Sequence, residues 1–197
     1  YTFSYAFSKQ LGEDIGGEGY ADMIPPFAPK GYIRGRVGSD RTHILAINSV
    51  YELPFGRGKR YLSALPAVAD AILGGWQLTG IYAFTSGYPL SFNVPGATLG
   101  NGWGTRADLV GNLRVSNPSA DGWFNTAALA APPMYTWGSS GMGILDGPGS
   151  HSLDTGMMKN ISIREGQTLQ FRWEMFNMPN HVNLSNPDTT FGLANTG

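Results

Sequence analysis

The sequence predicts an all-β chain of antiparallel, up-and-down strands that form part of a transmembrane β-barrel with long extracellular loops. Three observations predict this fold: about five segments in which apolar and polar residues alternate, few charged residues, and connections that are alternately long and short. Side chains alternate faces along a strand, so each segment has one apolar and one polar face. A soluble sandwich shows the same alternation, but two features favour a barrel: the many aromatic residues on the apolar face and the largely uncharged polar face.

The composition agrees with this fold and excludes several others. Glycine (28 residues) and aromatic residues (12%) are abundant. Only 14% of residues are charged, against about 25% in an ordinary soluble domain. The net charge of −1 gives no basic patch for nucleic acid, and the absence of cysteine excludes disulfides and Cys-ligated metals. No stretch approaches the roughly 20 apolar residues of a membrane helix.

The first two strands are expected over about 1–8 and 41–53, separated by a long loop at 9–40 that is rich in glycine, proline and charge. The chain opens inside the first strand, so we expect it to be a fragment. Pro54 stops the second strand because proline cannot donate to the ladder. A short helical piece is expected over 64–73, ended by Gly74 and the glycine after it.

The third strand, expected over about 76–94, is the longest and most aromatic. A membrane strand needs about 9–11 residues, so its outer part should stand above the membrane. A second long loop follows at 95–151. Apolar residues and one glycine occupy one parity of the strand, interrupted by Ser86: Trp76, Leu78, Gly80, Tyr82, Phe84, Tyr88, Leu90, Phe92 and Val94.

The fourth and fifth strands are expected over about 153–163 and 168–176, joined by a tight turn. The two long loops then lie at one end of the strands, and the two shorter connections lie at the other end. Outer-membrane barrels have this pattern of short periplasmic turns and long extracellular loops. Loops longer than about 15 residues are uncommon in compact domains and are usually functional.

Two sets of side chains are candidates for contact with the surroundings. The set predicted to face lipid is Trp76, Leu78, Tyr82, Phe84, Leu169, Phe171 and Trp173. Aromatic residues of the second long loop either stack on a ligand such as a sugar or pack the loops together. This second set is Trp103, Trp123, Tyr135 and Trp137.

No residue pattern indicates an enzyme, a metal site or a cofactor. His43, His151 and His181 lie far apart in the sequence and lack partners at ligand spacing. The basic turn at 56–60 lacks the upstream glycine and the Ser/Thr of a phosphate loop. Arg172 and Glu174 share a strand face, where a structural ladder inside a barrel is a simpler interpretation than catalysis.

Short motifs also follow one another along nearly the whole chain. Two of them are the run from Tyr51 to Arg60 and the run from Gly74 to Gly80; others cover 40–43, 86–89, 106–111, 123–128, 147–149, 159–160, 169–177 and 180–181. In this order they resemble the C-terminal half of TonB-dependent outer-membrane receptors, in the large subgroup with a carboxypeptidase-regulatory-like N-terminal domain.

The resemblance implies a bacterial outer-membrane barrel of about 22 strands with a plugged lumen, which imports a scarce solute with energy from TonB. Five strands would be one part of its wall. The expected partners are outer-membrane lipid, the remainder of the barrel or other β-chains at both sheet edges, and TonB through N-terminal parts absent from this segment. The plug and the final membrane strand are also expected outside it.

A second interpretation stays open. The chain could be a non-enzymatic structural or accessory β-protein, a released barrel segment that assembles with copies or other subunits. The two interpretations predict different masses for the native polypeptide. The receptor segment predicts a mass several-fold above 21.1 kDa, and the accessory protein predicts a mass close to 21.1 kDa.

Overall fold

The computed structural model describes residues 1–13, 28–29, 31–94, 99, 105–164 and 166–190. The chain divides into two compact units, which are described separately. Unit 1 comprises Tyr1–Ala6, Ile44–Phe84 and His151–Val182. Unit 2 comprises Phe7–His43, Thr85–Ser150 and Asn183–Gly197.

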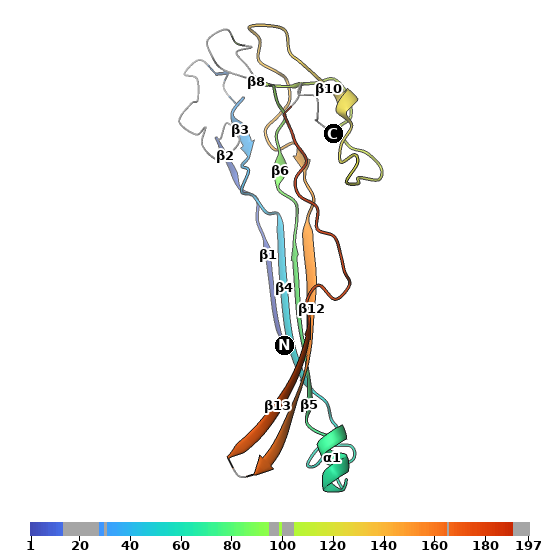
Figure 1. The fold of residues 1–197 in the computed structure, drawn as a ribbon. Helices are drawn as coiled ribbons and strands as arrows, with labels where there is room; N and C mark the ends of the chain where they lie inside the picture. Colours follow the sequence, from blue (N-terminus) through green and yellow to red (C-terminus); the bar gives the residue numbers. More distant parts are fainter. Residues whose placement is uncertain (14–27, 30, 95–98, 100–104, 165, 191–197) are drawn as a thin grey trace. The chain divides into compact units, whose positions relative to one another are not determined.

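Unit 1 is built on a five-stranded sheet of order β1-β4-β5-β12-β13 (Figure 1). Its long strands are neighbours in the order in which they occur in the chain, which confirms the predicted antiparallel up-and-down arrangement. The strands are β1 Thr2–Phe7, β4 His43–Glu52, β5 Trp76–Thr85, β12 Ser150–Arg164 and β13 Gln167–Met175.

The two connections at one end of this sheet contain a short helix and a tight turn. Helix α1 (Ala67–Leu73) follows Pro66 and ends at Gly74, whose N–H donates to the Asp70 carbonyl at 2.8 Å. The alanine-rich sequence favours a helix, and proline is tolerated at its beginning. At the β12–β13 turn, Gly166 adopts φ +76°, which glycine tolerates without strain. None of the described helices combines the length and apolarity needed to cross a membrane.

The predicted strand over 76–94 is wrong as one continuous element. β5 ends at Thr85, and two short strands follow, β6 (Pro89–Leu90) and β7 (Asn93–Val94). The break lies where the backbone of Gly87 meets that of Gly147: a Cβ on Gly87 would lie 1.7 Å from the Gly147 carbonyl oxygen. This close approach requires glycine, and the alternation of residue types does not reveal it.

The long connections contain more regular structure than the predicted loops, in four two-stranded sheets. The pairs are β2 (Leu11–Glu13) with β3 (Arg34–Arg36), β6 with β11 (Leu145–Asp146), β7 with β8 (Thr105–Arg106), and β9 (Asp108–Leu109) with β10 (Leu129–Ala130). A short 3-10 helix, η1 (Thr126–Ala128), precedes β10.

The apolar core of the described chain lies in unit 2. Phe92 is fully buried, and its ring meets that of Phe124 at 4.8 Å in a T-shaped contact. These two residues join a cluster that also contains Leu90, Val94, Ala107, Leu113, Ala128, Leu129 and Leu145. The outer part of the predicted third strand therefore supplies a protein core, because Leu90, Phe92 and Val94 are covered by the second long connection.

Candidate functional site

The aromatic face of the unit 1 sheet is set by the register of its strands. In the β12–β13 hairpin, Lys159 is paired with Phe171 and Met157 with Trp173, so these four side chains share one face. The Trp76 ring lies 6.3 Å from the Phe171 ring, nearly perpendicular to it. The predicted lipid-facing residues of β5 and β13 thus lie on one surface at this point. Contact of that surface with lipid stays a prediction.

The opposite face of the hairpin carries a polar ladder. Arg172 donates to the Gln170 side chain at 3.3 Å and lies 3.5 Å from a Glu174 carboxylate oxygen. Gln170 in turn donates to the Asn160 side chain at 3.0 Å. These contacts satisfy neighbouring side chains along and across the strands, as expected for a structural ladder.

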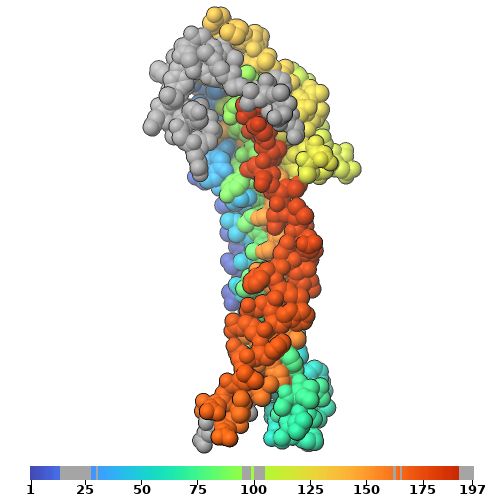
Figure 2. All heavy atoms as spheres, in the orientation of Figure 1, coloured from blue at the N-terminus to red at the C-terminus, as the bar shows by residue number. Residues whose placement is uncertain are grey.

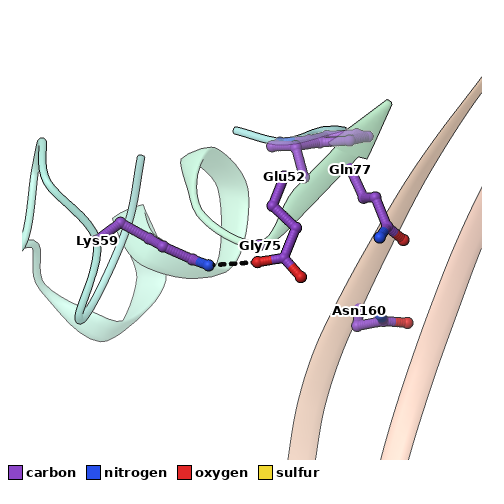
Figure 3. Close-up of a pocket in the computed structure, with 6 residues that line it drawn as sticks. Glu52, Lys59, Gly75, Gln77 and Asn160 are labelled. Atoms are coloured by element: carbon purple, nitrogen blue, oxygen red, sulfur yellow. Dashed lines mark hydrogen bonds and ion pairs between the residues drawn. The ribbon is translucent and has the colours of Figure 1, made fainter. Parts of the chain in front are cut away.

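A small polar hollow of about 230 Å³ opens beside this ladder in unit 1 (Figure 3). Lys59 and Glu52 form an ion pair of 2.6 Å at one side, and the amide side chains of Gln77 and Asn160 line the other. Ligand pockets for drug-sized molecules span about 300–1,000 Å³, so this hollow is too small for such a solute.

In unit 2, the buried Arg106 side chain links the first long connection to the second. The Arg106 guanidinium lies 3.7 Å from the centre of the Tyr32 ring. It donates to the Tyr32 carbonyl and, at 2.8 Å, to the Ser140 carbonyl. The Tyr32 hydroxyl accepts from the Arg106 backbone N–H at 2.8 Å. Burial lowers the pKa of Arg106, although arginine stays charged at any physiological pH.

A second set of contacts within unit 2 centres on Arg36. Its guanidinium donates to Asp40 at 2.9 Å, to Asp146 at 2.6 Å and to the Thr42 hydroxyl at 2.9 Å. Asp40 is almost fully buried and also accepts from the Gln10 N–H at 2.8 Å. Burial acts to raise the Asp40 pKa, but the hydrogen bonds from Gln10 and Arg36 outweigh it, so the pKa lies below its usual value.

These residues were not singled out by the sequence, since their partners are distant in the chain. Arg106 and Tyr32 are 74 positions apart, and Arg36 and Asp146 are 110 apart. Arg106 does lie in one of the motifs that carry the family resemblance, and this was the available signal.

The loop aromatics lie in different environments. Trp123 packs against the core and donates to the Asp146 carbonyl at 2.9 Å. The Trp137 ring meets the Tyr32 ring at 4.6 Å. Tyr135 is 73% exposed. Trp103 lies outside the described residues. Two of the four therefore pack the loops together, and a ligand-facing role for the set stays a prediction.

The three histidines are not gathered into one site. The rings of His151 and His181 stack at 3.6 Å within unit 1, a proximity that their sequence spacing does not reveal. His43 lies 5.4 Å from the Phe7 ring in unit 2. Across the described part of the chain, no group of three or more His, Cys, Asp or Glu side chains could hold a metal ion.

The chain matches a known family model over residues 1–197, and the model is described as an outer membrane beta barrel domain. No curated protein and no solved structure matches the chain significantly. The match agrees with the open sheet of unit 1, which has an up-and-down order and an exposed aromatic face. It places the chain in the bacterial outer membrane. The chain belongs to the outer membrane β-barrel domain family.

Proposed function

We propose that this chain supplies barrel wall and extracellular loops to a TonB-dependent receptor that imports a scarce solute. One observation carries the proposal: the two long connections form a cored unit held by the Arg106–Tyr32 and Arg36–Asp146 contacts. Loops that only close a barrel need no such core. Loops that bind a ligand do, because recognition requires side chains positioned by a rigid scaffold.

In this proposal the recognition surface is the exposed side of unit 2. Tyr135 is a candidate contact because its ring is exposed on a connection that is otherwise tied to the core. Trp123 and Trp137 act as positioning residues through their contacts with the loops. The polar ladder of Gln170, Arg172 and Glu174 faces the lumen of the barrel.

The edges of the unit 1 sheet support a larger barrel. β1 and β13 stand at the two ends of the sheet order, and every described β1 side chain is exposed. Unpaired strand edges are not tolerated in hydrocarbon, since each unsatisfied backbone group costs several kcal/mol. Both edges therefore pair with β-structure outside this segment, in the remainder of the barrel. Assembly with copies of the chain would use the same edges, so edge pairing alone does not separate the two interpretations.

Mass spectrometry of the native polypeptide from outer membranes tests the proposal. We expect a mass several-fold above 21.1 kDa and binding of the purified protein to the periplasmic domain of TonB from the same organism. A native mass near 21.1 kDa would refute the receptor and favour an assembling accessory protein. The proposal assigns no catalytic step. A turnover abolished by changing His43, His151 or His181 would contradict that part.

A further inference from the structure

The connection between β4 and β5, residues 54–75, combines basic residues with exposed apolar side chains. We refer to it as the α1 segment. It contains three basic residues, Arg57, Lys59 and Arg60, and one acidic residue, Asp70, so its net charge is +2 (3 − 1). The whole chain carries −1. This segment, at the end of the sheet that the loop lengths assign to the periplasm, therefore carries net positive charge.

The same segment exposes large apolar side chains. Val68 and Ile72 lie four residues apart and thus on one side of α1, where they are 75% and 62% exposed. Leu62 and Leu73 are also exposed, and α1 has no buried residue. In the space-filling view the segment (teal) forms a separate projection of unit 1 (Figure 2). A short helix with an uncovered apolar side is unfavourable in water.

The C-terminal end of α1 is tied to the aromatic face of the sheet. The Trp76 indole N–H donates to the Ile72 carbonyl at 2.9 Å. Lys159 donates to the Ile72 carbonyl at 3.1 Å and to the Gly74 carbonyl. Its ammonium lies 4.8 Å from the Trp76 ring, and its side chain is only 4% exposed. Lys159, on the apolar face, thus donates to carbonyl groups at the C-terminal end of α1 that have no intrahelical hydrogen-bond partner.

These contacts fix where the segment lies in unit 1. Lys159 shares a sheet face with Phe171, its register partner, and Trp76 contacts Phe171 on that face. Helix α1 therefore continues the aromatic surface of the sheet beyond the ends of β4 and β5. Aromatic residues and buried lysine stems with polar ends are typical of the membrane–water interface.

We propose that the α1 segment is an interfacial anchor that lies in the phospholipid leaflet at the periplasmic end of the sheet. Val68 and Ile72 enter the boundary between headgroups and acyl chains. Arg57 and Arg60 contact lipid phosphates. Lys59 is excluded from this role because it pairs with Glu52 at the polar hollow. The proposal goes beyond solute import and needs only the membrane location.

The two arginines differ in their present partners. Arg57, which is exposed, lies 3.9 Å from the half-buried Asp70, and an ion pair at this separation near the surface stabilises little. Arg60 lies against the Tyr61 ring at 5.4 Å. Both guanidinium groups can therefore reach an anionic headgroup without breaking a buried ion pair, and arginine binds phosphate in a bidentate manner.

Spin labelling of the full-length protein in lipid vesicles tests the anchor. The variant Val68→Cys carries a nitroxide, after any cysteine elsewhere in the polypeptide has been replaced; this chain has none. Val110→Cys is the matched control, since Val110 is also a well-exposed valine (64%) but lies in unit 2. The vesicles contain phosphatidylethanolamine and phosphatidylglycerol.

We expect the Val68 label to lie about 5–10 Å below the phosphates, accessible to oxygen and shielded from a water-soluble nickel chelate. The Val110 label should show the reverse. A Val68 label as accessible to nickel as the Val110 label would overturn the anchor. A label shielded from both reagents would also overturn it, because α1 would then be covered by protein from elsewhere in the barrel.

Two further variants separate the parts of the anchor. Lys159→Met should release the helix end and make the Val68 label more mobile, whereas Arg172→Met on the polar face should not. With Arg57 and Arg60 unchanged, we expect the Val68 label to lie deeper in vesicles that contain phosphatidylglycerol than in vesicles of phosphatidylcholine alone. The double variant Arg57→Gln with Arg60→Gln should abolish this difference in depth. An unchanged difference in the double variant would refute the role of the arginines.

Discussion

Leu90, Phe92 and Leu145 of unit 2 are buried together, whereas Leu169, Phe171 and Trp173 of unit 1 are each more than half exposed. Among the described residues of unit 1, the buried positions are Lys159 and three glycines: Gly56, Gly74 and Gly156. Unit 2 is thus arranged like a water-soluble protein, and unit 1 has its apolar side chains outside.

One pattern of alternation thus produces a buried apolar face in unit 2 and an exposed apolar face in unit 1. Both regions use apolar residues at every second position, because a strand sorts side chains onto two faces. In unit 2 the apolar face is covered by protein, and burial from water supplies the stabilisation. In unit 1 the apolar face is exposed, and we predict that lipid covers it, where exposure of leucine or phenylalanine carries no penalty.

The largest effect is expected when the 197-residue chain is produced alone in aqueous buffer. The exposed apolar face of unit 1 and the edges at β1 and β13 would then meet water. We expect aggregation or failure to fold, because edges and apolar patches of this kind promote association. Size-exclusion chromatography and thermal melting provide the measurement. A monodisperse monomer with a cooperative transition would show that the chain is a self-contained sandwich.

The second effect concerns the core of unit 2. Phe92→Ala removes a fully buried ring that contacts Phe124 and should cost about 3–5 kcal/mol. Phe171→Ala, at a half-exposed position of unit 1, is the comparison and should cost much less. Hydrogen exchange of each unit in the full-length protein reports the two losses. Equal losses would mean that Phe171 is also buried in a protein core.

The third effect concerns the apolar face of unit 1. Leu78→Arg should cost about 2–4 kcal/mol if Leu78 lies near the middle of the membrane. Gln77→Arg is the control, since Gln77 lies one residue away, beside Glu52 at the polar hollow. Urea-dependent folding into vesicles gives both values. A similar cost at the two positions would argue against a lipid-facing surface on β5.

The sequence predicts these units unequally, for physical reasons. Strict alternation around Leu78 and Phe171 predicts strands, because period two has no other simple cause. It does not distinguish Phe92, which is covered by protein, from Phe171, since lipid and protein interiors select the same residue types. The break at Gly87 depends on a distant glycine backbone, and the role of Lys159 depends on where α1 ends. The contacts of Arg36 and Arg106 join distant segments and leave no local period.

The smallest expected effect concerns the contacts of Asp40 in unit 2. Asp40→Asn removes the charge that pairs with Arg36 and keeps an oxygen for the Gln10 N–H, so we expect a loss of about 1–3 kcal/mol in the stability of unit 2. In the wild type the folded Asp40 pKa lies below the unfolded value of about 3.9. The stabilisation is therefore complete above that value and is lost as the pH falls through the folded pKa.

Asp40→Asn should lack this acid-dependent loss, because asparagine does not titrate. Asp121→Asn, at an exposed position of the same unit, should keep it. Hydrogen exchange or proteolysis of unit 2, followed from neutral pH to a pH below the folded Asp40 pKa, measures both, and unit 1 serves as the internal reference. If the wild type and Asp40→Asn lose protection over the same range, other carboxylates hold the loops. The Arg36–Asp40 contact would then be a consequence of their packing and not its cause.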